Sequence, residues 1–236
     1  MYALGAVVAY FLTAKIAEIK KSKITKNEIS DAIFYAMIGG VLGGRIFYVF
    51  VYHFPFFAEN PAEIFKVWHG GMSIHGGFLG GAAGLFWFSR RIKKNFWDFA
   101  DLFAPAIALG LAFGRLGNFV NGELVGRKTD FFLGKSFDGR HPSQLYAVLK
   151  DLFLAGILLF FVLKRNFSRG KISAIFLILY GIFRFFVEFF RAPDPQLGLF
   201  FGVISMGQIL SIFVFSLGVA LFWHFSKKSP HNKKAS

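Results

Sequence analysis

The 236-residue chain contains no cysteine and few charged residues. Without cysteine it has no disulfide scaffold, no thiolate metal ligand and no cysteine nucleophile of its own. Only 17% of its residues are charged, against about 25% in average soluble domains. Acidic residues are the scarcest, with 13 against 27 Lys and Arg, so the net charge is +14. Apolar residues make up 55% of the chain, which excludes an intrinsically disordered protein.

The apolar residues gather in long runs. A helix needs about 20 mainly apolar residues to cross a membrane. Seven such segments are predicted, at roughly 2–17, 30–53, 72–89, 97–116, 143–163, 172–190 and 206–225. We therefore expect an all-α, polytopic membrane protein with seven transmembrane helices, a small outward-facing segment at 117–142 and a single integral-membrane domain over residues 1–236. The first run meets Lys15 after only about 14 residues, too short for a full span, so we expect the natural chain to begin upstream.

The basic residues predict the orientation of the chain. Seventeen of the 27 Lys and Arg residues fall in segments that seven spans place on one side: 15–31, 90–95, 164–171 and the tail from Lys227. Six lie in the opposite loops. The positive-inside rule assigns the richer side to the cytoplasm, so the N-terminus faces out and the C-terminus faces in. Topology and contact with membrane lipids account for these charges, and we expect no nucleic-acid partner.

Residues 70–84 combine many glycines with one histidine. Gly76, Gly80 and Gly84 recur every four residues, and so do Gly77 and Gly81, which allows a neighbouring helix to approach closely. His75 stands at the entrance of this segment. It is a candidate base for proton transfer, and the alternative is a hydrogen-bonded structural histidine.

Residues 114–127 end the fourth span and enter the outward loop. Arg115, Asn118 and Asn121 are spaced by three residues, so a continuing helix would place them on one face. A guanidinium can bind a phosphate through two hydrogen bonds, and the amides add neutral donors. The alternative is a structural ion pair between Arg115 and Glu123.

The sixth span carries a polar face in a Phe-rich segment. Tyr180, Arg184, Glu188 and Arg191 step by four, four and three residues, so they share one helical face. Charges at membrane depth cost roughly 2.5–3.5 kcal/mol each, so this face predicts a polar cavity rather than lipid contact. We expect Glu188 to hold one of the two arginines and to leave the other available for an anion. The alternative is a purely structural network.

Three weaker features read mainly as packing and helix entry. They are the glycines before Arg45, the block His141-Pro142-Ser143-Gln144, where serine suits a helix cap, and Ser205 to Gln208, with a buried glutamine.

Four blocks give the chain a close resemblance to a known family. They are Trp68–Gly81, Gly114–Arg127, His141–Tyr146 and Tyr180–Arg191 with Pro193-Asp194 after it. The sequence resembles the prolipoprotein diacylglyceryl transferase family over nearly its whole length. The resemblance implies a transferase of the bacterial cytoplasmic (inner) membrane, with its active site toward the outer leaflet. Such an enzyme moves the diacylglyceryl group of phosphatidylglycerol to the lipobox cysteine of a prolipoprotein signal peptide. A thioether forms and glycerol phosphate leaves, as the first step of lipoprotein maturation.

The resemblance also implies roles for individual residues. The catalytic positions of the family fall on His75, Arg115, Arg184 and Tyr180, and its substrate-binding positions fall on Arg115, Arg184, Tyr2, Asn118, Glu123 and Gly126. The residue pattern adds Asn121, Glu188 and Arg191 as substrate-binding candidates. We expect no metal and no cofactor. Ala147 departs from the family pattern, which usually has an acid there. The alternative function is a lipid-phosphate or anion transporter that uses the same cavity.

Overall fold

The computed structural model describes residues 2–165, 167–192 and 203–227, apart from the side chains of Tyr2, Ala3 and His75. This part of the chain is helical: it forms no β-strand, only two isolated bridges. Its α-helices are α1 (Tyr2–Ile19), α2 (Lys26–Phe47), α3 (Phe54–Glu59), α4 (Ile74–Arg91), α5 (Phe96–Val120), α6 (Ser143–Lys164), α7 (Lys171–Glu188) and α8 (Met206–Lys227). The predicted all-α class is confirmed, and each of the seven predicted ranges contains one long helix.

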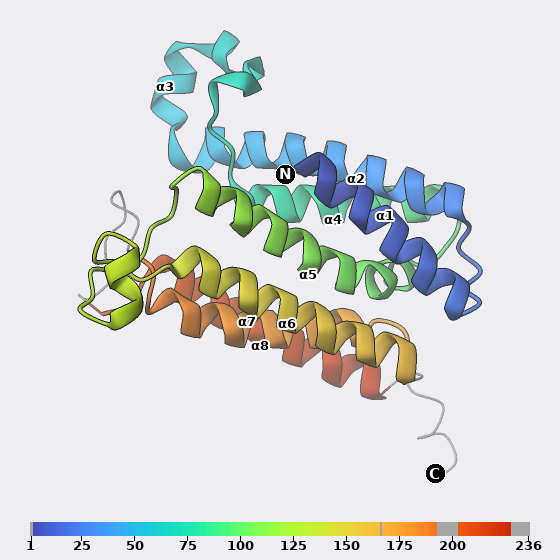
Figure 1. Ribbon diagram of the computed structural model, residues 1–236. Coiled ribbons are helices and arrows are strands. Elements are labelled where there is room, and N and C mark those ends of the chain that lie inside the picture. The colour runs from blue at the N-terminus through green and yellow to red at the C-terminus, as the bar shows by residue number, and fades with distance from the viewer. Residues whose placement is uncertain (1, 166, 193–202, 228–236) are drawn as a thin grey trace. The chain divides into compact units, whose positions relative to one another are not determined.

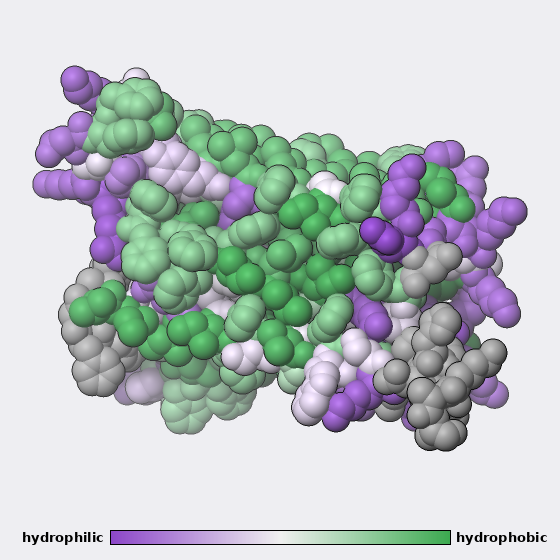
Figure 2. All heavy atoms as spheres, turned by 90° about the horizontal axis from the view of Figure 1, so that it is seen from below, coloured by the Kyte–Doolittle hydropathy of each residue, from purple (hydrophilic) through white to green (hydrophobic). Residues whose placement is uncertain are grey.

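Four of these helices are long and apolar enough to cross a membrane: α2 with its extension to Tyr52, α5, α6 and α8. Figure 2 shows many hydrophobic side chains on the surface in view. Exposed apolar side chains in such number suit contact with the hydrocarbon layer of a membrane. The chain divides into two compact units, residues 22–99 and residues 1–21 with 100–236.

In the unit formed by residues 22–99, α2 and α4 lie side by side (Figure 1). Glycines make this contact. A Cβ atom on Gly39 would lie 2.2 Å from the carbonyl oxygen of Gly80, and one on Gly43 would lie 2.4 Å from that of Gly76. A Cβ atom on Gly84 would lie 2.3 Å from another α2 carbonyl. The predicted close approach along the Gly76, Gly80 and Gly84 strip is confirmed, and the partner strip on α2 has the same four-residue period.

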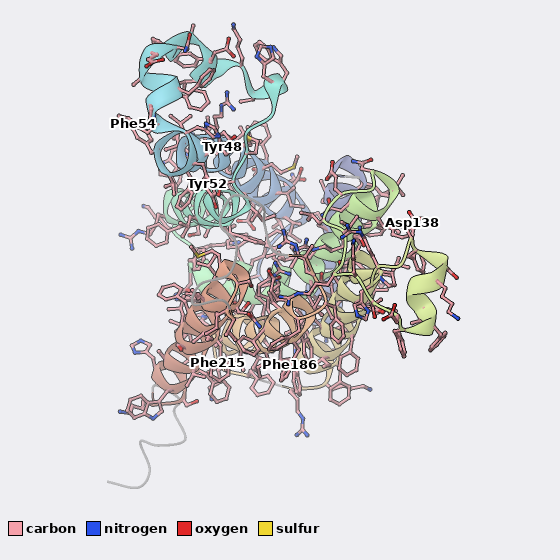
Figure 3. All side chains as sticks on the ribbon, turned by 90° about the vertical axis from the view of Figure 1, so that its left-hand side faces the viewer. Tyr48, Tyr52, Phe54, Asp138, Phe186 and Phe215 are labelled. Carbon is pink, nitrogen blue, oxygen red and sulfur yellow. The ribbon has the colours of Figure 1, made fainter. Side chains whose placement is uncertain are left out.

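The segment between α2 and α4 folds around Arg45. This buried guanidinium donates hydrogen bonds to the backbone carbonyl oxygens of Ile64 at 2.9 Å and Gly71 at 3.0 Å, and to three others nearby. Its carbon lies 5.1 Å from the centre of the Phe57 ring. Figure 3 shows Tyr48 and Tyr52 at the start of the same segment, where their rings stack. The charge of Arg45 therefore organises a turn-rich segment that has no regular ladder of its own.

The second unit contains α1, most of α5, and the three helices α6, α7 and α8, of which α7 contacts both α6 and α8 (Figure 1). Asp101 on α5 fixes the start of α7. Its carboxylate accepts hydrogen bonds from the backbone N–H groups of Gly170 at 2.7 Å and Ser173 at 2.8 Å. These groups have no intrahelical partner at a helix N-terminus, and a carboxylate there also complements the helix dipole. Phe186 lies on the outer surface of α7, while the opposite side of the helix carries the polar residues (Figure 3).

We expect Gly39→Ala and Gly40→Ala to separate backbone crowding from helix propensity. A Cβ atom on Gly40 would lie 3.5 Å from its nearest neighbour, an ordinary contact, whereas one on Gly39 would overlap the Gly80 carbonyl. Overpacking costs about 1–3 kcal/mol, so Gly39→Ala should lower the apparent melting temperature in detergent by several degrees. Gly40→Ala should leave it unchanged or raise it slightly, because alanine favours helix by about 1 kcal/mol. Equal melting temperatures for the two variants would contradict the observed packing.

Candidate active site

A small cavity lies within the second unit, where α5, α6 and α7 meet the segment between α5 and α6. Three arginines, two hydroxyl or amide side chains and three apolar residues line it: Arg115, Arg184, Arg191, Ser143, Gln144, Leu124, Ala147 and Val187. The sequence-predicted face of α7 and the arginine of α5 therefore meet in one place. The lining combines strong hydrogen-bond donors with three apolar side chains, which suits an anionic group attached to an apolar body.

The start of α6 holds the outward loop over the cavity. The side-chain amide of Gln144 donates to the Glu123 carbonyl oxygen at 2.7 Å, and the Ser143 hydroxyl donates to the Leu124 carbonyl oxygen at 3.1 Å. Ser143 was expected to cap α6. Instead it is the first helical residue, and its hydroxyl bonds to the loop because the preceding Pro142 occupies the cap position. Both side chains are buried, so these bonds fix the loop rather than merely end a helix.

Gly126 lets two backbone segments come together beside the cavity. A Cβ atom on Gly126 would lie 2.0 Å from the carbonyl oxygen of His141, so no larger residue fits without a backbone shift. Gly126 also forms an isolated bridge with Arg191, and the Arg127 N–H donates to the Phe190 carbonyl oxygen at 2.9 Å. The end of α7 is thereby tied to the loop that follows α5. The sequence indicated Gly126 as a substrate-binding position, and the structure gives it a packing role at the edge of the site.

Glu188 is the carboxylate on which the cavity arginines converge. Its oxygens lie 2.7 Å from Nη1 of Arg184 and 3.6 Å from Nη1 of Arg191, and the Ser205 hydroxyl donates to it at 3.1 Å. We expected Glu188 to hold only one arginine, and that prediction is wrong. Arg184 lies one turn before Glu188 on α7, and the turn after α7 brings Arg191 back to the same carboxylate, so each of its two oxygens faces one guanidinium. A Cβ atom on Gly207 of α8 would lie 2.5 Å from the same carboxylate, so a larger residue there would displace the Glu188 side chain from this position.

Arg115 is the cavity arginine without a bonded partner. Its side chain forms no hydrogen bond and no ion pair with any residue that the structure describes, although it interacts electrostatically with Arg184, Tyr180 and Asp151. The alternative of a structural ion pair between Arg115 and Glu123 is not realised: Glu123 is exposed and contributes its backbone instead. A guanidinium held inside the protein without a carboxylate is poised to bind an incoming anion.

The two asparagines differ in their placement. Asn118 lies in the last turn of α5, and its backbone carbonyl oxygen accepts a hydrogen bond from the backbone N–H of Glu123 at 2.8 Å. Asn121 lies beyond the end of α5 and is exposed, so the predicted single helical face stops at Asn118. The helix ends because Gly122 adopts a φ of 69°, a left-handed conformation that glycine reaches without strain.

Two charged residues of the site were missed by the reading of the sequence. Lys150 and Asp151 of α6 are buried, pair with each other and lie next to Tyr180, whose ring centre is 4.9 Å from Nζ of Lys150. A signal was present, because this is the only adjacent pair of opposite charges inside the 143–163 run. We assigned both residues to the apolar span, although a charged side chain at membrane depth costs enough free energy to need an explanation.

His75 and Tyr2 are placed only through their backbones. His75 lies in the first turn of α4 and Tyr2 at the start of α1, and both side chains fall outside the described residues, as do Pro193 and Asp194. His75 also belongs to the 22–99 unit, whereas the arginine cluster belongs to the other. Ser73, two residues before His75, caps α4 by accepting from the Gly76 N–H at 3.4 Å.

Comparisons with known proteins agree over the length of the chain. A family model described as prolipoprotein diacylglyceryl transferase matches residues 1–224. The phosphatidylglycerol–prolipoprotein diacylglyceryl transferase of Aeromonas salmonicida is 45% identical over 237 residues, which cover 97% of this chain and 85% of the relative. The proteins of that name in Photobacterium profundum and Vibrio parahaemolyticus are 44% and 43% identical. They match 98% and 100% of this chain, and 88% of each relative is covered.

Proposed function

Because the chain belongs to the prolipoprotein diacylglyceryl transferase family, we propose that it transfers the diacylglyceryl group of phosphatidylglycerol to the cysteine thiol of a prolipoprotein. The observation that carries the proposal is the cavity in which Arg115, unpaired within the described residues, meets Arg184 and Arg191. The phosphate of phosphatidylglycerol is the group in this reaction that such a cavity would bind. Leu124, Ala147 and Val187 add apolar side chains to the lining, next to which the glycerol that carries the acyl chains would lie.

The charges of the cluster suit the product of the reaction better than the substrate. Arg184 and Arg191 face the carboxylate of Glu188, and Arg115 adds a guanidinium that pairs with no carboxylate among the described residues, so the cluster offers a positive charge to an anion. The phosphodiester of phosphatidylglycerol carries one negative charge, whereas the released glycerol phosphate, with a second pKa of about 6, carries nearly two at neutral pH. The negative charge on the phosphate therefore grows as the bond to the leaving group breaks. A positively charged site stabilises the transition state, in which this charge has grown, more than the bound lipid, which is the requirement for catalysis.

The reaction then follows from these groups. The prolipoprotein thiol loses its proton, and its sulfur attacks the glycerol carbon that bears the phosphate ester. The carbon–sulfur bond forms as the carbon–oxygen bond breaks, and glycerol phosphate leaves with the bonding electron pair. Arg115 and Arg184 bind the departing phosphate, and Glu188 holds Arg184 in position. We assign proton removal to His75, since a thiol with an ordinary pKa of about 8.5 is mostly protonated at neutral pH.

The remaining substrate-binding roles are part of the same proposal. Asn118 and Tyr180 lie on the α5 and α7 faces that carry Arg115 and Arg184, which suits hydrogen bonding to the glycerol head or the phosphate. Glu123, Asn121 and Gly126 belong to the loop over the cavity, where the prolipoprotein would enter. For Tyr2 the support is the family motif alone. Phosphatidylglycerol, the prolipoprotein signal peptide and membrane lipids are thus the partners that we propose.

For the membrane arrangement, we propose seven transmembrane helices in one integral-membrane domain of the bacterial inner membrane, N-terminus out and C-terminus in. The seven long helices and the uneven distribution of basic residues support this arrangement. The arginine cavity lies at the end of α7 that adjoins the 117–142 segment, which this topology puts on the outer side. The lipid and a secreted prolipoprotein would then meet at the outer leaflet.

Purified protein incubated with phosphatidylglycerol and a lipobox peptide should give a peptide whose mass has increased by one diacylglyceryl group. Arg115→Lys keeps the charge and disturbs no described bond, so it should lower the rate by about tenfold or more, because lysine cannot bind two phosphate oxygens at once. Arg184→Ala should lower it by about two decades. Arg90→Lys, on the exposed end of α4, is the matched control and should retain the parental rate. No adduct with the parental protein would overturn the proposed function.

The role of His75 predicts a pH dependence. His75→Gln removes the base, so the variant depends on thiolate that forms spontaneously. The loss of transfer rate relative to the parental protein should be large near pH 6.5. It should shrink toward pH 9, where a thiol with a pKa of about 8.5 is largely ionised. The rate ratio of parental protein to variant, measured across this range with a lipobox peptide, checks the assignment. A ratio that stays constant with pH argues for a positioning role instead.

The absence of cysteine makes the topology directly measurable. A single cysteine introduced as Asp138→Cys should react with a membrane-impermeant maleimide in intact spheroplasts. Lys93→Cys, at the end of α4, should react only after the membrane is opened. The cysteine-free parent is the control for background. The reverse labelling pattern would invert the proposed orientation.

A further inference from the structure

The middle of α6 contains a buried ion pair that the proposed chemistry does not use. The side chains of Lys150 and Asp151 are 8% and 1% exposed, and Nζ of Lys150 contacts Oδ1 of Asp151. A buried ion pair is weak support for stability, because desolvation of both charges offsets their attraction, and apolar residues of similar size often serve as well. A contribution to stability therefore does not explain why an ion pair is buried at this position.

The pair lies one helical turn from the lining of the arginine cavity. Asp151 is on the buried stripe of α6 that includes Ser143, Gln144 and Ala147, and it stands one helical turn from Ala147, which lines the cavity. Nζ of Lys150 lies 4.9 Å from the centre of the Tyr180 ring. Tyr180 lies one turn before Arg184 on α7. Both charges also interact electrostatically with Arg115 and Arg184.

One carboxylate oxygen of Asp151 can accept a further hydrogen bond. Oδ2 is buried and accepts no hydrogen bond from the described residues, while Oδ1 is taken by Lys150. Arg115, which pairs with no carboxylate among the described residues, is the arginine that Asp151 would attract if the charge of Asp151 were not already balanced. An ion pair between Arg115 and Asp151 would compete with any anion for the same donors.

We propose that Lys150 is a positioning residue for the anion site: by neutralising Asp151 it keeps Arg115 available for the phosphate of the ligand. The inference rests on the proposed function for the identity of that phosphate. Lys150 contacts Asp151 and Tyr180, and it acts on the ligand through Arg115. Its contact with the face of the Tyr180 ring, a favourable cation–π geometry, holds the two side chains against each other.

The test compares four variants whose effects differ in sign. Lys150→Met leaves Asp151 unbalanced, so binding of glycerol phosphate should weaken by about tenfold. Asp151→Asn removes the competing carboxylate, so binding should stay equal or become tighter. The double variant Lys150→Met with Asp151→Asn should bind as the parental protein does, within about threefold. Lys150→Arg keeps the charge and should also bind within about threefold of the parental value.

The coupling to Arg115 gives a second readout. In an Arg115→Gln background, Lys150→Met should have little further effect on binding, because the residue through which Lys150 acts is gone. Binding is measured by calorimetry with glycerol phosphate and purified protein in detergent, with the melting temperature of each variant recorded alongside. In transfer assays, Lys150→Met should raise KM for phosphatidylglycerol and leave KM for the lipobox peptide unchanged.

The outcomes separate the two claims. If every variant, Asp151→Asn included, binds glycerol phosphate more weakly, the pair has a structural role and the inference is overturned. The inference is also overturned if Lys150→Met binds with the affinity of the parental protein, or if the parental protein does not bind glycerol phosphate. If Lys150→Met does not fold, Asp151→Asn decides: equal or tighter binding supports the inference, and a tenfold loss overturns it. Parental protein that binds glycerol phosphate in the predicted pattern but transfers nothing would contradict the proposed function alone.

Discussion

The carboxylate of Glu188 faces Arg184, Arg191 and Ser205 from the end of α7, and the rest of the site is arranged around it. In an apolar chain, each buried guanidinium must be balanced or it carries a large desolvation cost. Glu188 faces both Arg184 of α7 and Arg191, which lies just beyond the end of α7, and its carboxylate packs against Gly207 of α8. Arg115 comes from α5 and pairs with no carboxylate among the residues that the structure describes. The donors of Arg115 are therefore not taken up by a carboxylate in this part of the chain.

The same constraint explains why the outward loop is tied so closely to the helices. Backbone groups in a loop need partners when they are buried. Gln144 and Ser143 supply them from the start of α6, and Gly126 allows the chain to pass against His141. These bonds hold the wall of the cavity on the ends of regular helices, which are more rigid than the loop itself. The binding site that we propose for a charged head group is thus assembled from helix ends, where donors are available.

Much of the fold could be read from local pattern. Each apolar run coincides with a long helix in the part of the chain that the structure describes, and four of these helices are long and apolar enough to cross a membrane. A membrane-spanning helix satisfies its own backbone hydrogen bonds and must be apolar along its length, so composition alone locates it. The period of Gly76, Gly80 and Gly84 predicted a close helix contact, and Gly39 and Gly43 carry the matching pattern. The blocks around Arg115 and Arg184 indicated the family. The shared helical face was correct for Tyr180, Arg184 and Glu188, whereas Arg191 lies beyond the end of α7. The number of arginines that Glu188 holds was not predicted correctly.

The sequence by itself determined the helical class, the membrane character, the family and the residues with phosphate-binding chemistry, because these depend on composition and on spacing within single helices. Only the tertiary structure decided which charges neutralise one another. Whether Arg115 pairs with Glu123, with Asp151 or with neither depends on how α5, α6 and α7 pack, over contacts between residues far apart in the chain. The Lys150–Asp151 pair acquired a meaning only when its place beneath Ala147 and beside Tyr180 was known. Electrostatic energy depends on the distance and burial of specific atoms, and no periodicity along the sequence encodes either.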